Sequence, residues 1–327
     1  MLKQLFASFF WAACMLAAGL FSCQPAAAQP INVRAAHPSV DVQYLPAYVA
    51  KAKGMFKDEG LEVELIVMLG GRSGVQALAG GGVHFVMQIG ATLPAIWGGA
   101  DFKIVAQMLN MLPFSLMVRP DIQRLEELRG KRIGLSVGTT TQALVHELLR
   151  VNGLDPDKGF EYVNIPGAAA RIAALEKGLV VAAPMSAPGD LKAIHAGFKR
   201  LVFFGDVLPE ISATGLIASA TYIKENPRTV EKMVRAIVRG TIAARDDPAT
   251  AIEVMQTSMR MSADDARETY RLVRKSLTPV LTEAGVRNMA GLVSGSAKIA
   301  QTKEPREYID AAFLNRALAE TPKNTGR

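Results

Sequence analysis

The chain has 327 residues, a formal net charge of +7 and a hydrophobic content of 50%. This length is enough to bury a large core, as one large domain or as two lobes, without support from disulfides or metals. Lysines and arginines are scattered, which argues against a nucleic-acid-binding protein; the mild positive charge favours attraction of small anions, unless it reflects only the basic character of many exported proteins.

The N-terminus has the pattern of a secretory signal peptide. Lys3 is the only charged residue before an apolar run at residues 5–21, and Ala26-Ala27-Ala28 follows. A basic start, a short apolar stretch and small residues predict a signal peptide over residues 1–28, cleaved before Gln29, and therefore a periplasmic protein. Two alternatives stay open: an uncleaved membrane anchor, and a lipoprotein tethered to the membrane through Cys23.

Cysteine and histidine usage excludes several kinds of site. Both cysteines, Cys14 and Cys23, lie in the predicted leader, so the mature chain has no thiol for a disulfide, a zinc-thiolate site or a nucleophile. The four histidines are far apart in the sequence: His37, His84, His146 and His195. Because no pair has the spacing of metal ligands, we expect no metal site. We also expect no cofactor.

Strands alternate with helices up to about residue 204. The first half predicts strands at 31–36, 61–68, 83–87 and 103–109, with helices at 46–53 and from 74 to the glycines at 80–82. The second half predicts strands at 132–135, 161–165, 179–182 and 200–204, with helices at 142–152 and 168–177. This alternation predicts an α/β fold in which helices flank mainly parallel sheets.

The same order of elements occurs twice. Residues in the two halves match at a constant offset of 97: Gly70, Ala77, Leu78, Gly81 and Val83 pair with Gly167, Ala174, Leu175, Gly178 and Val180. Single identities mean little in an apolar chain, but a shared offset and a shared element order predict two similar lobes.

Two extended apolar stretches, at 114–119 and 212–219, join the predicted lobes. Two crossings of this kind predict a two-strand hinge with a cleft between the lobes. The expected division is a signal peptide at 1–28, lobe I at 29–113, lobe II at 114–214, and a return to lobe I at 215–327. The last part predicts helices beginning at Asn226-Pro227 and covering 250–259, 263–275 and 283–300, before a disordered tail after Glu320.

Candidate binding residues lie where strands lead into helices. Beyond the C-terminal ends of parallel strands, helix N-termini offer unpaired N–H groups to a ligand. In lobe I the candidates are His37, Ser39, Gly71, Arg72, Ser73, Gln88, Gly90 and Thr92. In lobe II they are Gly138, Thr139, Thr140, Thr141, Gly167, Met185 and Ser186, and Tyr44 and Phe114 are candidates for an apolar wall.

The strongest candidate is the loop from Gly138 to Thr141. Glycine allows close approach of the backbone, and the threonine hydroxyls can donate to a carboxylate or sulfonate. The alternative is an ordinary helix N-cap whose hydroxyls bond only to their own backbone. Arg72 is the second candidate, since its guanidinium can make a two-pronged contact to an oxyanion, and the alternative is a surface arginine at a helix start.

Three segments carry a resemblance to a known family. Residues 46–65 (PAYVAKAKGMFKDEGLEVEL), 77–85 (ALAGGGVHF) and 128–134 (LRGKRIG) are similar to motifs of the nitrate/sulfonate/taurine-type (NMT1-like) substrate-binding proteins of ABC transporters. The likeness extends over residues 31–245, and the first motif is the most specific. The family often has Asp where this chain has His84 and Val181, so the resemblance leaves the ligand class open.

This resemblance implies a two-lobed type II periplasmic-binding fold and an extracytoplasmic receptor that delivers its ligand to an ABC transporter permease. The implied ligands are sulfonates, nitrate-like anions, aromatic carboxylates or pyrimidines, and we expect a monomer that binds no nucleic acid. The alternatives are a receptor for a pyrimidine or thiamine precursor, a ligand-sensing module, and an enzyme similar to the thiamine-pyrimidine synthase of the same fold. Export and the lack of mature cysteines argue against the enzyme, and the chain has no His-Glu-x-x-His or Gly-Lys-Ser/Thr motif.

Overall fold

The structure is a computed structural model that describes residues 29–208 and 210–321. The predicted signal peptide at 1–28 and the tail from residue 322 lie outside the described residues. Residues 31–321 belong to one compact unit, whereas Gln29 and Pro30 belong to a separate unit and carry no helix or strand. None of the helices within the described ranges combines the length and the apolar character needed to cross a membrane.

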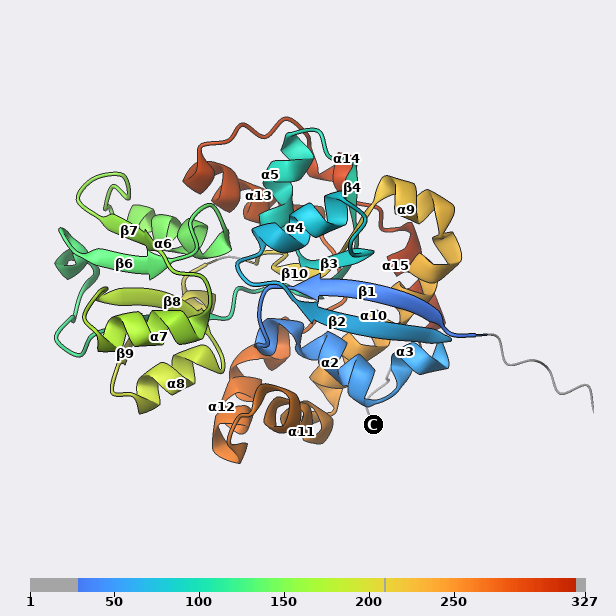
Figure 1. The fold of residues 1–327 in the computed structure, drawn as a ribbon, viewed down its shortest axis with the longest axis horizontal. Coiled ribbons are helices and arrows are strands. Elements are labelled where there is room, and N and C mark those ends of the chain that lie inside the picture. Colours follow the sequence, from blue (N-terminus) through green and yellow to red (C-terminus); the bar gives the residue numbers. More distant parts are fainter. Residues whose placement is uncertain (1–28, 209, 322–327) are drawn as a thin grey trace, which may run out of the picture. The chain divides into compact units, whose positions relative to one another are not determined.

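The first sheet has five strands in the order β2-β1-β3-β10-β4 (Figure 1). Its strands are β1 (Ile31–His37), β2 (Leu61–Val67), β3 (Phe85–Gln88), β4 (Phe102–Leu109) and β10 (Thr214–Ser219). Strand β1 is parallel to β2 and β3, whereas β10 is antiparallel to β3 and β4. We call this sheet and the helices packed on it lobe I.

The second sheet has the same arrangement, in the order β7-β6-β8-β5-β9. Its strands are β5 (Phe114–Val118), β6 (Arg132–Leu135), β7 (Glu161–Asn164), β8 (Ala182–Ser186) and β9 (Lys199–Phe203). Here β6 is parallel to β7 and β8, and β5 is antiparallel to β8 and β9. We call this sheet with its helices lobe II.

Both sheets are mixed because of the two segments that cross between the lobes. Strand β5 follows the first crossing and β10 follows the second, and each is the strand that runs antiparallel to its neighbours. The crossings lie against each other: the N–H of Ile211 donates to the carbonyl of Asn110 (2.9 Å), and that of Ala213 to Leu109 (3.0 Å). This paired connection is a two-strand hinge, as the sequence predicts, but it lies just before the predicted stretches at 114–119 and 212–219, most of which form strands β5 and β10.

Helices cover both faces of the lobe I sheet. On β3, Val86 faces helices α4 (Arg72–Ala79), α5 (Ile89–Trp97) and α13 (Glu283–Ala297), whereas Phe85 and Met87 face α2 (Leu45–Ala52), α10 (Pro227–Asp246) and α15 (Ala312–Glu320). Successive side chains of a strand point to opposite faces, so both of its faces are buried. The remaining helices of the C-terminal part are α9 (Ala220–Glu225), α11 (Pro248–Met259), α12 (Ala263–Val273) and α14 (Pro305–Tyr308), and α3 (Met55–Asp58) follows α2.

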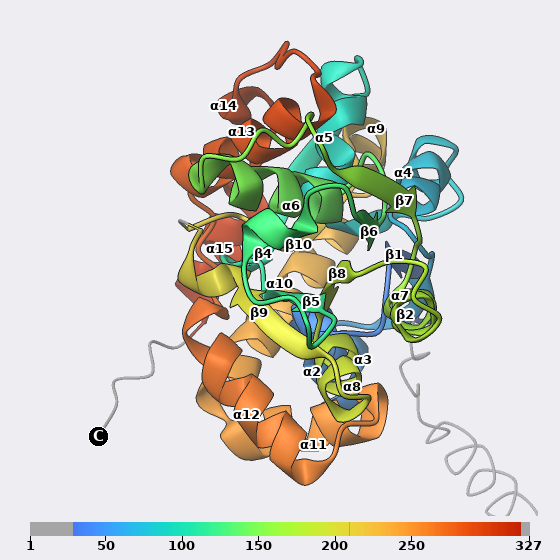
Figure 2. The same cartoon turned by 90° about the vertical axis from the view of Figure 1, so that its left-hand side faces the viewer.

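Lobe II is covered in the same way (Figure 2). Leu116 and Ile133 face helix α6 (Thr140–Val151), and Met117 and Ala183 face α7 (Ala168–Glu176) and α8 (Gly189–His195). Helix α6 also packs against α13 of lobe I, so the two lobes share an apolar contact beside the hinge.

Backbone geometry agrees with the repeat seen in the sequence. The paired glycines Gly70 and Gly167 have φ angles of +85° and +86°, and Gly81 and Gly178 have +70° and +64°. These are left-handed conformations that favour glycine, and they stand at the same turns of the two lobes.

The strand predicted at 179–182 is wrong in position. The N–H groups of Leu179 and Val180 both donate to the carbonyl of Ala174, at 2.9 and 3.4 Å, so these residues close the C-terminus of helix α7. A positive-φ glycine followed by such bonds is a common helix ending, and it delays the start of β8 to Ala182.

Candidate functional site

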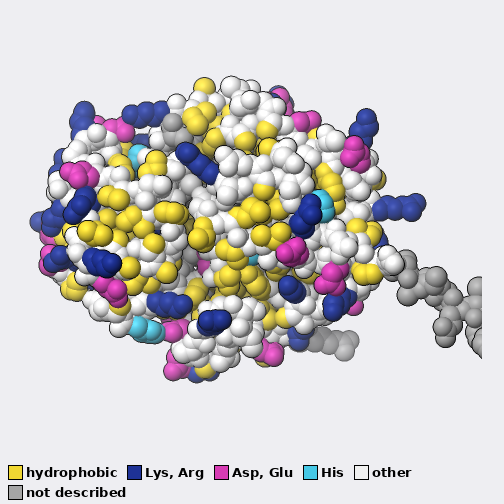
Figure 3. Space-filling model, viewed as in Figure 1, with side chains coloured by type: hydrophobic (Ala, Val, Ile, Leu, Met, Phe, Trp, Pro, Cys, Tyr) yellow, Lys and Arg dark blue, Asp and Glu magenta, His cyan; other side chains and the backbone are white. Residues whose placement is uncertain are grey.

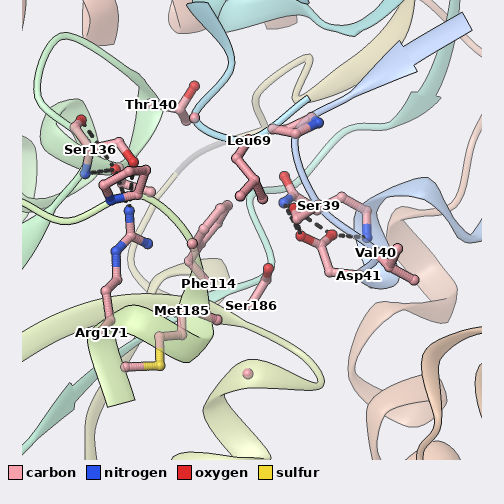
Figure 4. A pocket seen from close by; sticks show the side chains of 18 of the residues that line it. Ser39, Val40, Asp41, Leu69, Phe114, Ser136, Thr140, Arg171, Met185 and Ser186 are labelled. Carbon is pink, nitrogen blue, oxygen red and sulfur yellow. Dashed lines mark hydrogen bonds between the residues drawn. The ribbon is translucent and has the colours of Figure 1, made fainter. Parts of the chain in front are cut away.

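A cavity of about 480 Å³ lies between the two lobes, where the parallel strands of both sheets end. Figure 4 shows side chains from both lobes converging on it. Of the residues predicted from the sequence, those that line it are Ser39, Tyr44, Gln88, Phe114, Thr139, Thr140, Thr141, Gly167, Met185 and Ser186. Contact between these residues and a ligand remains a prediction.

The loop before α6 forms one wall of the cavity. The Thr139 hydroxyl donates to the carbonyl of Ser136 (2.8 Å), and the Thr141 hydroxyl accepts from the N–H of Ser136 (3.0 Å). The N–H of Gly138 is also occupied, by the side chain of Gln142 at 2.6 Å. Within the part of the chain that the structure describes, the Thr140 hydroxyl has no such partner, so it is the hydroxyl of this loop best placed for a ligand.

Arg171, on the first turn of α7, is the buried cation of the cavity. Its side chain is 4% exposed, and its guanidinium donates to the carbonyls of Ile165 (2.9 Å) and Pro184 (2.8 Å) and to the hydroxyl of Ser136 (2.8 Å). No carboxylate is paired with it among the residues described. Burial lowers the pKa of Arg171 to about 10, so the group stays charged at neutral pH.

Asp41 lies on the opposite side of the cavity from Arg171 (Figure 4). It caps the short 3-10 helix Val42–Tyr44: its carboxylate accepts from the N–H of Gln43 (2.9 Å) and from the hydroxyl of Ser39 (2.5 Å). Burial raises the pKa of Asp41, and hydrogen bonds from Ser39, Gln43 and Ser186 oppose that rise. Ser186 belongs to lobe II, and it lines the same cavity as Asp41.

Apolar side chains make up much of the remaining wall. Phe114 and Leu69 lie between the two charged groups in Figure 4, and Met185 also lines the cavity. Tyr44 is 2% exposed, with its ring 4.9 Å from that of His37. In the space-filling view, apolar surface gathers where the two lobes meet (Figure 3).

Several predicted residues do not line the cavity: His37, Gly71, Arg72, Ser73, Gly90, Thr92 and Gly138. His37 is buried, bonded through Nδ1 to the carbonyl of Ser39 (2.7 Å) and through Nε2 to the Tyr48 hydroxyl (3.2 Å). The Thr92 hydroxyl donates to the carbonyl of Gln88 (2.6 Å), and that of Ser73 donates to Leu69 (3.2 Å). These side chains hydrogen-bond to the backbone near the cavity and do not line the cavity themselves.

Arg72 and Gly138 lie at a contact between the lobes, and Gly71 packs against a side chain of its own lobe. The guanidinium of Arg72, in lobe I, lies against Gly138 of lobe II, where a β-carbon would stand 2.0 Å from Nη2. Gly71 lies against Gln88, whose amide donates to its carbonyl at 2.6 Å. Arg72 therefore contacts the loop beside the cavity rather than the cavity itself.

Sequence reasoning missed Arg171 and Asp41. Arg171 is the one charged residue in the run Ala168-Ala169-Ala170-Arg171-Ile172-Ala173-Ala174-Leu175, and a charge in an otherwise apolar helix segment is a signal that could have marked it. Asp41 lies two residues after the predicted binding residue Ser39, so extending that candidate loop by two residues would have included it.

The family model for NMT1/THI5-like proteins matches residues 41–251, which is most of the two-sheet region described above. The chain belongs to the NMT1/THI5-like family. The matched range begins at Asp41 and includes Arg171 and the whole of lobe II. The family resemblance predicted from the sequence motifs is therefore confirmed.

Individual proteins are similar in sequence to this NMT1/THI5-like chain. The Bacillus subtilis protein YtlA, whose name calls it a candidate binding protein, is 26% identical over 215 residues. The match spans 64% of this chain and 64% of the length of YtlA.

Two solved structures show the same architecture. The alkanesulfonate-binding protein SsuA of Xanthomonas axonopodis, bound to MOPS, has a TM-score of 0.75 at 17% identity, over 87% of this chain and 100% of that one. The nitrate-binding protein NrtA of Synechocystis has a TM-score of 0.78 at 11% identity, over 90% of each chain. The two-lobed type II periplasmic-binding fold is thus confirmed.

Proposed function

We propose that this NMT1/THI5-like protein is a non-catalytic receptor that captures a small organic anion between its lobes and delivers it to the permease of an ABC importer. The observation that carries the proposal is Arg171, a buried guanidinium in the cavity with no carboxylate partner among the described residues. A buried charge is costly unless it is paired, and an anionic ligand would supply the pair.

The arrangement around Arg171 supports an anion at this position. Its Nη2 lies 2.8 Å from Ser136 Oγ and 3.5 Å from Thr141 Oγ1, at the N-terminus of the 12-residue helix α6. The positive end of a helix dipole adds to the field of the guanidinium. The names of SsuA and NrtA, which are sulfonate- and nitrate-binding proteins of this fold, agree with an anionic ligand.

A thermal-shift screen tests the receptor. We expect organic anions to raise the melting temperature, whereas neutral and cationic compounds of the same size do not. A ligand at 100 times its dissociation constant stabilises the folded state by about 2.7 kcal/mol, which is readily measured. A screen in which no anion shifts the melting temperature, or in which the purified chain turns over its ligand, would contradict the proposal.

The receptor is also proposed to be exported through its N-terminal segment. The pattern of Lys3, the apolar run at 5–21 and Ala26-Ala27-Ala28 supports cleavage before Gln29. Protein isolated from the periplasm of the producing cell should begin at Gln29 by N-terminal sequencing. A mature chain that begins at Met1, or at an acylated Cys23, would show that the leader is an anchor or a lipoprotein signal instead.

A further inference from the structure

The cavity is large relative to a small anion. Its volume of about 480 Å³ lies within the range of roughly 300–1,000 Å³ that holds drug-sized molecules. Nitrate or acetate would fill a small part of this space and leave much of its wall in contact with water. The anion subsite at Arg171 is therefore one end of a larger binding volume.

Much of that wall is apolar side chain in contact with water. Leu69 is 62% exposed, Val67 is 44% exposed and Val40 is 38% exposed, yet all three line the cavity. Phe114 and Met185 line it too, from the start of β5 and from the end of β8. Covering such surface with an apolar ligand body is favourable, in proportion to the area removed from water.

The charges of the cavity are divided between its two sides. Arg171 stands on one side, and Asp41 stands on the other (Figure 4). Oδ1 of Asp41 accepts from the backbone N–H of Gln43 at 2.9 Å and Oδ2 accepts from its side-chain amide at 3.3 Å, so both oxygens act as acceptors, as they do in an ionised carboxylate. The second cation on the cavity wall, Lys192, is exposed to solvent, so water screens its charge.

We propose, on the basis of the function proposed above, that the cavity selects organic monoanions with an apolar, ring-sized body, and that Asp41 rejects ligands with a second negative charge. Arg171 holds the anionic group, the apolar wall at Leu69 and Phe114 contacts the ring, and the far end of the ligand faces Asp41. A second carboxylate there would be desolvated next to a like charge, with no buried cation to pair with it among the residues described.

Calorimetric titration of the full chain with four anions tests this selectivity. The probes are 4-methylbenzoate, terephthalate, acetate and nitrate, of which the first two differ in a second carboxylate and the first and third in the ring. We expect 4-methylbenzoate to bind at least about tenfold more tightly than acetate or nitrate, because it covers the apolar wall. We also expect it to bind at least about tenfold more tightly than terephthalate, because of the second charge.

Two variants with matched controls assign the selectivity to residues. Leu69→Ala should weaken 4-methylbenzoate binding by about fivefold and leave acetate unchanged, whereas Leu179→Ala, at another exposed leucine outside the cavity, should change neither. Asp41→Asn should reduce the preference for 4-methylbenzoate over terephthalate to about threefold, since the like charge is removed. Asp247→Asn, at the N-cap of α11 and outside the cavity, should preserve the full preference.

The outcomes separate this inference from the proposed function. If acetate or terephthalate binds as tightly as 4-methylbenzoate, the inference fails while the anion receptor stands. If Asp41→Asn is folded and keeps the full preference, Asp41 is not the selecting residue; should the variant not fold, the four affinities of the unaltered protein still decide the ligand class. If none of these anions binds and no anion in the thermal-shift screen raises the melting temperature, both proposals fall.

Discussion

Replacement of Arg171 by glutamine is expected to weaken anion binding by roughly 30- to 150-fold, the equivalent of about 2–3 kcal/mol for a hydrogen bond to a charged group. The guanidinium is the buried cation of the cavity, and glutamine keeps polarity while removing the charge. Calorimetric titration with the anion that gives the largest thermal shift measures the loss. The affinity of Arg171→Lys should lie between those of the unaltered protein and Arg171→Gln, because lysine keeps the charge but not the fork of donors.

The control for this substitution lies in the same lobe. Arg132 is the first residue of strand β6, at the opposite end of the strand from the cavity-lining Ser136. It is exposed and outside the cavity, so Arg132→Gln should leave the affinity unchanged. Arg171→Gln also removes donors from the carbonyls of Ile165 and Pro184, so its melting temperature is recorded alongside. A folded Arg171→Gln variant that binds anions like the unaltered protein would show that the anionic group lies elsewhere.

Strand positions and the hinge could be predicted because their signals are local. Apolar runs bounded by glycine and proline mark the strands, and the extended apolar stretches predicted at 114–119 and 212–219 contain strands β5 and β10, which directly follow the two crossings. The antiparallel direction of β5 and β10 cannot be predicted from the local sequence, because it depends on how each crossing segment enters the sheet of the other lobe. Helix α11 begins at Pro248, before the predicted residue 250, because Asp247 caps it and proline occupies its first turn.

Part of the candidate site could also be predicted, because some of its residues have local sequence signals. Thr140, Phe114 and Ser186 follow strand ends or the hinge, and the rule that ligands bind at strand ends finds such residues from sequence alone. Arg171 lies inside a helix, and it reaches the cavity only because α7 packs beside the loop before α6. The hydrogen bond from Arg171 to Ser136 joins residues that are 35 positions apart in the sequence. Arg72 has the chemistry of an anion ligand at a helix start, but the closeness of lobe II directs its guanidinium onto Gly138.

The second large effect is expected from Gly90→Ala, which should weaken ligand binding by roughly tenfold or more through lobe closure. Gly90 lies on helix α5 of lobe I, and a β-carbon there would stand 2.7 Å from Thr140 Oγ1 of lobe II and 2.9 Å from Met289 Sδ. Overpacking of this kind costs about 1–3 kcal/mol, and separating the lobes relieves the contact with Thr140. Because the proposed ligand site lies between the lobes, a smaller closed population should raise the apparent dissociation constant in proportion.

Stability and shape distinguish this mechanism from simple unfolding. Alanine favours a helix over glycine by about 1 kcal/mol, so the unliganded Gly90→Ala protein should melt close to the unaltered one, while X-ray scattering should show a larger radius of gyration with ligand present. Gly291→Ala on α13, where a β-carbon meets nothing within 4 Å, is the matched control and should bind normally. In a Thr140→Ala background the cost of Gly90→Ala should fall, since one of the two close contacts is removed. Strictly additive losses in that cycle would mean that Gly90 and Thr140 do not meet when the ligand is bound, and that the closed state brings the lobes together at other residues.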